Sequence, residues 1–306
     1  MPTEFSLYLP ASSANLGPAL DCAALALNFG LQVRARAADQ WRIAATGRDA
    51  AICGNLKDHL IVQSYCEMLQ GAGRPVRPLE LALDNAIPVG RGCGSSAAAR
   101  LTGVALATHF GEMGWDASRV FESAVALEGH PDNVAACWWG GLVLARTAPG
   151  GTTSWLRAPL PVRWPLLMAV APQALATSEA RSVLPRHYKR ADVVHNLQSA
   201  LLLIQALQQG RGDMLPSLFA DRLHQPYRAS LCPLLTALAP LAGRAGVVGC
   251  ALSGAGPSVL LVLEHDDSQE TAVAAIEQAL HAEGLQAELL RAEIEPRGPG
   301  SEWAPQ

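Results

Sequence analysis

The chain has 306 residues, and at about 100–200 residues per domain this length predicts two domains or two fused lobes. Half of the residues are hydrophobic and 16% are charged, which indicates a packed core and excludes a globally disordered chain. The formal net charge is −4. The sequence has no basic stripe and no basic amphipathic helix, so neither a nucleic acid nor a membrane is expected as a partner.

The cysteines and the apolar stretches indicate the compartment. Seven cysteines are scattered along the chain and form no CxxC pair, a pattern that favours reduced thiols in a cytoplasmic protein. The first residues lack a basic segment followed by an apolar run, so no secretory signal is expected. The longest apolar stretch, residues 134–145, is too short to span a bilayer.

The first half of the chain predicts interleaved strands and helices. Apolar residues lie near helical spacing in residues 57–69, and Gly71 and Gly73 follow to end that helix. A second helix is expected to begin at Asp116, which serves as its N-cap. The predicted elements of this half are strands at 5–9, 31–36, 79–83 and 141–146, and helices at 57–69, 95–109 and 116–127.

The second half follows a segment rich in Gly, Pro, Thr and Trp, residues 147–164, where we expect the lobe boundary. This divides the chain into lobes at 1–155 and 156–306. The predicted elements are strands at 165–170, 247–252, 258–263 and 286–293, and helices at 191–208, 213–220, 231–242 and 269–283. The last ten or so residues are expected to fray. Interleaved helices and strands in both halves predict an α+β architecture of two lobes.

The strongest local signal is the segment PVGRGCGSSA, from Pro88 to Ala97, which passes directly into the predicted helix. Its glycines permit positive φ angles and a close approach to a ligand. Where the helix begins, the first amides lack partners and the macrodipole is positive, so the segment predicts an anion site. No lysine follows the last glycine, and the glycine spacing does not fit a dinucleotide fingerprint, which excludes those two kinds of phosphate loop. The alternative is a capped turn that binds no ligand, in which the glycines only permit the backbone geometry of the turn.

Further segments accompany this loop along the chain. They are LPASSANLGPALD at 9–21, EGHPDNVA at 128–135, TSEARSVLP at 177–185, QPYR at 225–228 and LSGAGPS at 252–258. In this order and spacing, the segments resemble the homoserine kinases of the GHMP kinase superfamily across about residues 5–295. Three departures from the family pattern, at Ala19-Leu20, Cys93 and Ala136, remove no charged or hydrogen-bonding group.

The resemblance implies the two-lobe GHMP kinase fold, with a ribosomal-protein-S5-like first lobe and a ferredoxin-like second lobe. It implies that ATP, with Mg²⁺, donates its γ-phosphoryl group to the side-chain hydroxyl of L-homoserine. The product would be O-phospho-L-homoserine, which feeds threonine synthesis. Relatives also suggest a homodimer.

The resemblance also assigns the residues that bind the substrate. Asn15 is expected near the substrate hydroxyl, and Asp21 is expected to hold the substrate ammonium. Arg181 and Arg228 are expected to bind the carboxylate, because a guanidinium matches a carboxylate with two parallel hydrogen bonds. Thr177 is a weaker candidate for contact with the substrate or the γ-phosphate.

The nucleotide and its metal are assigned in the same way. Glu122 is the predicted Mg²⁺ ligand because it lies eleven residues before Asn133, the spacing of the superfamily's metal carboxylate, and Glu128 is the competing carboxylate. Ser96 is expected to complete the metal site, since Mg²⁺ takes few protein ligands. The residues expected at the nucleotide are Pro88, Gly90, Arg91, Gly92, Cys93, Gly94, Ser95 and Ser96, together with Ser253, Gly254 and Gly256.

The segment EGHPDNVA at 128–135 places His130, Asp132 and Asn133 close together, which invites assignment of a general base. In related mevalonate- and galactose-type kinases an Asp matches Asn133, and an asparagine cannot accept the proton. We therefore expect phosphoryl transfer without a strong protein base, carried by positioning and charge neutralisation, with catalytic roles for Asn15, Asn133 and Arg181. His130 and Asp132 are expected to shape the loop and the substrate site.

Other functions remain open at this stage. The chain could be another GHMP kinase that acts on a mevalonate-like alcohol or a sugar, although paired ligands for an ammonium and a carboxylate favour an amino acid. It could also be an inactive relative that binds ATP and regulates a partner. A structural or nucleic-acid-binding protein with an S5-like lobe conflicts with the acidic balance.

Overall fold

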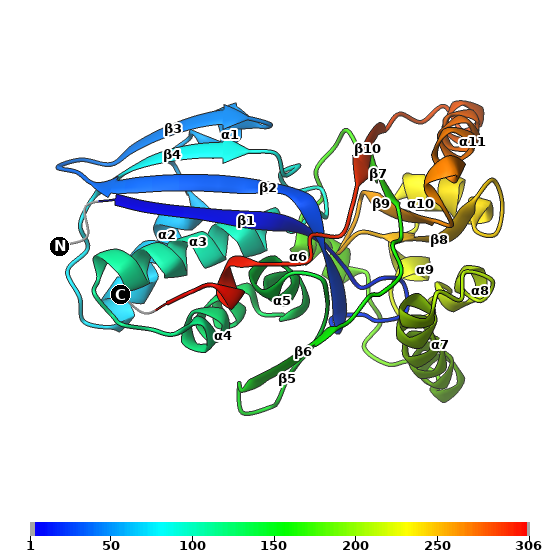
Figure 1. Cartoon of the computed structure of the whole chain (residues 1–306), viewed down its shortest axis with the longest axis horizontal. Coiled ribbons are helices and arrows are strands. Elements are labelled where there is room, and N and C mark those ends of the chain that lie inside the picture. The colour runs from blue at the N-terminus through cyan, green and yellow to red at the C-terminus, as the bar shows by residue number, and fades with distance from the viewer. Residues whose placement is uncertain (1–3, 305–306) are drawn as a thin grey trace.

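The computed structural model describes residues 4–304 and consists of two lobes, each built on its own sheet (Figure 1). The sheet of the first lobe has six strands in the order β3-β4-β2-β5-β6, with β1 also paired to β2. Only β3 and β4 run parallel among these pairs. The strands are β1 Glu4–Ala14, β2 Ala23–Ala37, β3 Arg42–Gly47, β4 Leu79–Asn85, β5 Leu142–Thr147 and β6 Thr153–Ala158.

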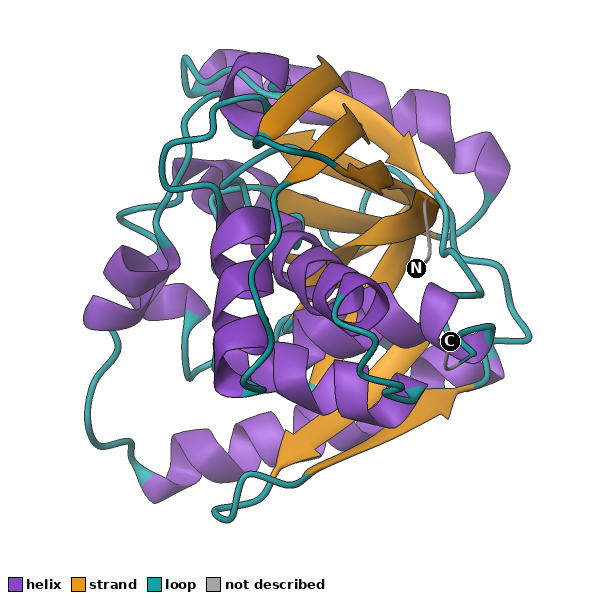
Figure 2. Ribbon diagram, turned by 90° about the vertical axis from the view of Figure 1, so that its left-hand side faces the viewer, coloured by secondary structure: helices purple, strands orange, loops and turns teal. Residues whose placement is uncertain are grey.

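Helices cover only one face of the first sheet, and the alternation of buried and exposed side chains along its strands explains why. Residues 4–9 of β1 alternate between exposed and buried, so their apolar side chains share the face that the helices cover (Figure 2). Small residues let two of these helices approach closely, because a Cβ at Gly103 would lie only 2.5 Å from the Cβ of Ser64. The helices are α1 Ala50–Cys53, α2 Leu60–Gly71, α3 Ser95–Phe110, α4 Ala117–Glu128 and α5 Asp132–Trp139.

The second lobe is a four-stranded antiparallel sheet in the order β10-β7-β9-β8. Its strand β7, Leu166–Val170, is buried on both faces: Leu167 and Ala169 pack toward α10 and α11, whereas Leu166 and Met168 belong to the core that includes α7. The other strands are β8 Val247–Leu252, β9 Val259–Leu263 and β10 Glu288–Ala292. The helices are α6 Thr177–Ser182, α7 Arg190–Gln209, α8 Leu215–Leu218, α9 Gln225–Arg228, α10 Pro233–Leu238 and α11 Gln269–Ala282, with short 3₁₀ turns at Ala239–Leu241, Asp266–Ser268 and Pro299–Ser301.

The predicted two-lobe α+β fold is confirmed, and several elements differ in extent. The helix after the glycine loop begins at Ser95 as predicted, and Asp116 caps α4 by accepting a hydrogen bond from the Arg119 amide at 2.8 Å. Strands β1 and β2 are much longer than predicted because pairing with each other extends them past their alternating segments. The short elements β3, β6, α1, α5, α6 and α9 were not predicted, since short segments carry too few residues to establish a period.

The end of the described chain returns to the first lobe (Figure 1). Ile294 pairs with Leu27 of β2, and the ring of Trp303 packs 5.3 Å from that of Trp138 in α5. The prediction that this segment frays is therefore wrong as far as residue 304. The division at residue 155 stays a prediction; β6 belongs to the first sheet through Ala158, and the second sheet begins at Leu166.

Two predictions from composition can be compared with the structure. All seven cysteines lie within the described residues and are free thiols, and four of them are buried. Among the helices of residues 4–304, none combines the length and the apolar character needed to cross a bilayer.

Candidate functional site

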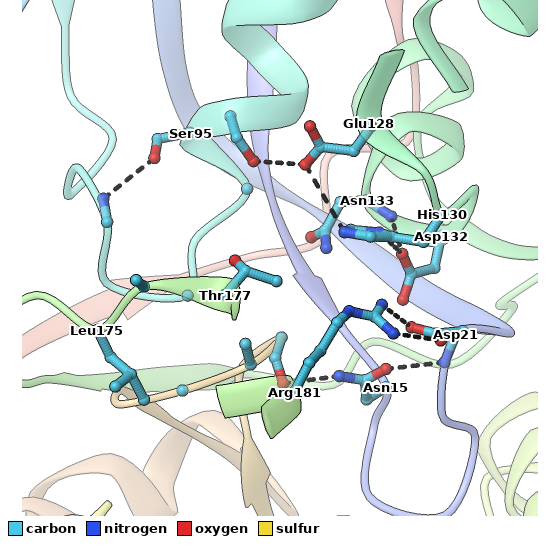
Figure 3. Close-up of a pocket in the computed structure, with 18 of the residues that line it drawn as sticks. Asn15, Asp21, Ser95, Glu128, His130, Asp132, Asn133, Leu175, Thr177 and Arg181 are labelled. Carbon is cyan, nitrogen blue, oxygen red and sulfur yellow. Dashed lines mark hydrogen bonds and ion pairs between the residues drawn. The ribbon is translucent and has the colours of Figure 1, made fainter. Parts of the chain in front are cut away.

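A polar pocket lies where the loops of both lobes converge (Figure 3). Its volume is about 170 Å³. Segments far apart in the sequence meet here, as when the Asn15 side-chain amide donates a hydrogen bond of 2.6 Å to the Gly254 carbonyl. The residues that line it are Asn15, Asp21, Gly90, Gly92, Gly94, Ser95, Ser96, Glu128, His130, Asp132, Asn133, Leu175, Ala176, Thr177, Arg181, Arg228, Gly254, Ala255 and Gly256.

The glycine loop forms one wall of this pocket. Gly90, Gly92 and Gly94 have φ angles of 69°, 80° and 74°, which residues other than glycine rarely adopt. A Cβ on Gly92 would collide with the carbonyl oxygen of Ser253, and one on Gly94 would collide with the hydroxyl of Ser12. The loop is therefore held between β1 and the second lobe, and only glycine fits at positions 92 and 94.

Helix α3 begins at the pocket and leaves its first amides available. Gly94 is its N-cap, and no side chain caps the helix. The Ser95 hydroxyl instead accepts a hydrogen bond of 3.2 Å from the Gly90 amide, which closes the loop. Unpaired amides and the positive end of a helix of 16 residues together make a site suited to a phosphate group.

Four residues predicted at the nucleotide do not line the pocket themselves. Cys93 is buried behind the loop, where burial raises the pKa of its thiol to about 12, and Pro88 is also buried. Arg91 forms an ion pair of 2.9 Å with Asp49. Ser253 donates a hydrogen bond of 2.6 Å from its hydroxyl to the Gly92 carbonyl. These side chains stabilise the loop rather than face the cavity.

The segment after β1 carries unusual backbone angles. Asn15, Leu16 and Asp21 have φ angles of 73°, 43° and 55°. Asn15 accepts a hydrogen bond of 2.9 Å from the Asp21 amide through its side-chain oxygen, while its amide group binds the second lobe at Gly254. Such backbone strain persists only where the surroundings hold it, and it is concentrated at functional sites.

Asp21 and Arg181 pair with each other across the pocket (Figure 3). The guanidinium of Arg181 makes two hydrogen bonds to the Asp21 carboxylate, at 2.7 and 3.1 Å. Burial alone would lower the pKa of Arg181, but the Asp21 hydrogen bonds and charge raise it. Both side chains are more than a third exposed, at 39% and 37%, so this pair is accessible from solvent.

Arg228 is a buried guanidinium without a carboxylate partner in the described part of the chain. It is 1% exposed, and its only hydrogen bonds there run from Nε to the Ala180 carbonyl at 3.0 Å and from Nη1 to His224 Nδ1 at 3.1 Å. Burial and the positive charge of Arg181 lower its pKa. A buried, unpaired charge is costly, and two guanidiniums that line one pocket favour an anion between them.

His130 and Asp132 form a cluster with Asp21 in the lining of the pocket. His130 Nδ1 lies 2.9 Å from Asp132 Oδ1, and ligand atoms of Asp21, His130 and Asp132 lie within 4.8 Å of one another. Burial alone would lower the pKa of His130, but the hydrogen bond and charge of Asp132 and the charges of Glu128 and Asp21 raise it overall. Asn133 is held differently, since its side-chain oxygen accepts a hydrogen bond of 2.8 Å from the Ser12 hydroxyl.

The two candidate metal carboxylates lie in different places, and Glu122, the predicted Mg²⁺ ligand, lies away from the pocket. Glu122 does not line the pocket; it borders a separate hollow with Trp115 and Arg119. Glu128, at the end of α4, is 6% exposed in its side chain, accepts a short hydrogen bond from the Ser96 hydroxyl and pairs with Arg100 at 2.7 Å. Glu128 is thus the carboxylate that stands beside the glycine loop.

The sequence did not single out several residues that the structure places at the site. Leu175, Ala176 and Ala255 line the pocket, but apolar residues in loops carry no local signal of such a role. His224 forms a hydrogen bond with the guanidinium of Arg228 but does not itself line the pocket. Its only sequence signal is its position directly before the QPYR segment.

Comparisons with known proteins agree with these features. Sequence profiles for the GHMP kinases N terminal domain and GHMP kinases C terminal match residues 59–141 and 203–282. Homoserine kinase of Solibacter usitatus (strain Ellin6076) is 42% identical over 294 residues, covering 96% of each chain. Homoserine kinase of Synechocystis sp. is 35% identical, covering 96% of this chain and 97% of its own. The crystal structure of homoserine kinase from Cytophaga hutchinsonii superposes with a TM-score of 0.81 at 23% identity, covering 97% of each chain.

Proposed function

The chain belongs to the homoserine kinase family of the GHMP kinases, and from this premise we propose that it transfers the γ-phosphoryl group of ATP to the side-chain hydroxyl of L-homoserine. The product, O-phospho-L-homoserine, serves threonine synthesis. One observation carries the proposal: a single pocket combines an uncapped, glycine-lined helix start with a buried, unpaired guanidinium and a cluster of acidic groups. The first feature suits a phosphate, and the others suit a zwitterion.

The zwitterion would replace the ion pair between Asp21 and Arg181. A substrate ammonium can take the place of the guanidinium beside Asp21, with His130 and Asp132 close by. The substrate carboxylate can then bind Arg181 and Arg228, both of which line the pocket. An ion pair this exposed contributes only about 0–1 kcal/mol, so the exchange costs little and yields two new charge-assisted contacts.

The volume of the pocket also supports a small substrate. At about 170 Å³, it suits a small amino acid but cannot enclose a nucleotide, since drug-sized ligands occupy pockets of about 300–1,000 Å³. The triphosphate would therefore lie along residues 90–96, with the base and ribose outside the enclosed part. This arrangement directs the terminal phosphate toward the substrate.

The chemistry in this proposal depends on position and charge. The substrate oxygen attacks the γ-phosphorus and forms the new P–O bond as the bond to the β-phosphate oxygen breaks, and the hydroxyl proton leaves to the phosphate or to water. Asn133 cannot take that proton, and its oxygen already accepts from Ser12. The amides at the start of α3 stabilise phosphate charge, while Asn15 and Arg181 orient the substrate; orientation alone can supply roughly 7–11 kcal/mol.

Oxygen donors suited to Mg²⁺ stand at the phosphate end of the pocket. The Ser96 hydroxyl and the Glu128 carboxylate lie in direct contact, and the carboxylate is largely buried. Hard oxygen ligands of this kind, few in number, are what Mg²⁺ takes in phosphate sites. Ser96 and Glu128 would hold Mg²⁺, which would neutralise phosphate charge when bound. Arg100 holds Glu128 in place through its own ion pair.

The proposal is tested by an assay of ADP formation with the purified protein. ADP is expected to form only when homoserine, ATP and Mg²⁺ are all present, and turnover of mevalonate or galactose is expected to be far lower. Formation of ADP that does not depend on homoserine, or a faster reaction with another alcohol, would overturn the proposed substrate. No turnover of any alcohol would support an inactive relative.

Replacing Glu128 by glutamine is expected to raise the Mg²⁺ concentration needed for half-maximal rate by about tenfold or more, a loss typical of altered metal ligation. Glu122→Gln is the matched control, because it removes the other candidate carboxylate from the same helix without touching the pocket. Its Mg²⁺ requirement is expected to stay unchanged. If Glu122→Gln raises the Mg²⁺ requirement and Glu128→Gln does not, Glu122 is the metal ligand.

Two broader predictions remain part of the proposal. A cytoplasmic location fits the free thiols of the chain. A homodimer is supported by the outer face of α7, where contiguous apolar side chains are typical of an interaction surface. Those exposed side chains are Val193, Val194, Leu197, Leu201 and Leu202.

A further inference from the structure

We infer that His224 is a positioning residue, which presents the guanidinium of Arg228 to the carboxylate of the substrate. The inference rests on the proposed function and extends it to a side chain that does not line the pocket. His224 is 0% exposed, whereas Arg228, four residues later, is 1% exposed and does line it. The histidine therefore acts through the arginine and not on the substrate.

The hydrogen bonds of His224 define a single tautomer. Nδ1 lies 3.1 Å from Arg228 Nη1, and Nε2 lies 2.7 Å from the Gly17 carbonyl oxygen. A guanidinium can only donate, so Nδ1 must accept; a carbonyl can only accept, so Nε2 must carry the hydrogen. Only the neutral ring with its proton on Nε2 satisfies both partners.

The surroundings keep the ring neutral. Burial lowers the pKa of His224, and the positive charge of Arg228 lowers it further, against the opposing charges of Asp221 and Asp21. A protonated ring would direct an N–H group at Arg228 and break the contact. The carboxylate oxygens of Asp221 instead accept hydrogen bonds from the backbone amides of His224 and Gln225, at 2.9 and 2.6 Å. They also accept one from the side-chain amide of Asn196, at 2.7 Å.

This arrangement holds the arginine at two points and leaves one nitrogen for a ligand. The Ala180 carbonyl binds Nε and His224 binds Nη1, while Nη2 has no hydrogen-bond partner in residues 4–304. The ring also connects Arg228 to Gly17, in the same loop as Asn15 and Asp21. The group that would bind the carboxylate is thus fixed relative to the loop that would bind the ammonium.

Two substitutions separate the hydrogen bonds of His224. In His224→Asn the side-chain oxygen can take the place of Nδ1 and accept from Arg228, but the contact with Gly17 is lost. In His224→Gln the amide nitrogen can take the place of Nε2 and donate to Gly17, but the acceptor for Arg228 is lost. We expect the Gln variant to raise KM for homoserine by about tenfold, equivalent to one charge-assisted hydrogen bond, with kcat and the KM for ATP little changed.

The Asn variant is expected to keep a KM for homoserine near that of the parent. With 3-aminopropan-1-ol, which is homoserine without its carboxylate, the two variants are expected to behave alike. His59→Gln is the control, since this half-buried histidine also binds a backbone carbonyl, that of Cys53 at 2.9 Å, and does not line the pocket.

Equal KM values for homoserine in the Asn and Gln variants would overturn the positioning role, and so would a Gln effect that persists with 3-aminopropan-1-ol. Loss of thermal stability without a change in KM would show that His224 serves the fold alone. These outcomes are distinct from failure of the proposed function, in which the parent protein itself would not phosphorylate homoserine.

Discussion

Replacing Gly92 by alanine is expected to lower kcat/KM by about a hundredfold or more, with a higher KM for ATP. Gly92 has a φ of 80°, and a Cβ there would collide with the Ser253 carbonyl and lie 2.9 Å from the Gly256 carbonyl oxygen. Backbone atoms on both sides cannot turn away, so the loop itself must shift. A displacement of about 1 Å in a site that positions reacting groups costs roughly a hundredfold in rate. Initial rates over a range of ATP concentrations measure the effect.

The control for Gly92 is Gly114→Ala. Gly114 also has a positive φ, 62°, but a Cβ there meets no atom within 4 Å. This variant carries the backbone strain of about 1–2 kcal/mol without the collision, so we expect a modest loss of stability and normal ATP kinetics. If Gly92→Ala retains the parent KM for ATP while folded, the phosphate does not bind at this loop.

Removing the buried charge of Arg228 is expected to raise KM for homoserine by about tenfold to a few hundredfold, because each charge-assisted hydrogen bond is worth roughly 1.5–3 kcal/mol. Methionine is the best replacement, since it fills much of the same volume without a charge. KM for ATP is expected to stay near the parent value. With 3-aminopropan-1-ol the parent and Arg228→Met are expected to differ little, because that alcohol has no carboxylate to lose. Steady-state kinetics with both substrates provide the measurement.

Thermal unfolding separates this binding role from a structural one. Arg228 is 1% exposed with no carboxylate partner among the described residues, so its removal takes away a costly buried charge and the ligand-free protein should lose little stability. The control is Arg163→Met, an exposed arginine that pairs with Asp266 and Glu293 away from the pocket. A large fall in melting temperature with an unchanged KM would assign Arg228 to the fold instead.

Glu122 and Glu128 show that spacing along the sequence does not place a side chain at a site, since only Glu128 lines the pocket. Glu122 and Glu128 lie on the same helix, six residues apart, which corresponds to about 9 Å along the axis and about 120° around it. Gly129 then ends the helix with a φ of 84°, and the chain turns back at the level of Glu128. Spacing along the sequence cannot tell which of two carboxylates faces a loop, because the rotation of the helix is set by its packing.

The charged residues of the pocket show the same limit. Asp21 and Arg181 are 160 residues apart, and the family resemblance assigns them to the ammonium and the carboxylate of a substrate, yet without a substrate they bind each other. Nothing in the QPYR segment indicates that Arg228 has no carboxylate partner among the described residues, or that His224 forms a hydrogen bond with its guanidinium. Both facts arise from the way α9 packs against the loop after β1.

The sequence alone determined the glycine loop, the start of α3, most of the longer elements and the likeness to a kinase family. It could do so because backbone preferences, capping and hydrophobic periods depend on a few consecutive residues. The tertiary structure decided which carboxylate stands beside Ser96 and which side chains meet in one pocket. These outcomes depend on how two sheets and their helices pack, as in the contact of Asn15 with Gly254 across 239 residues, and no local pattern carries that information.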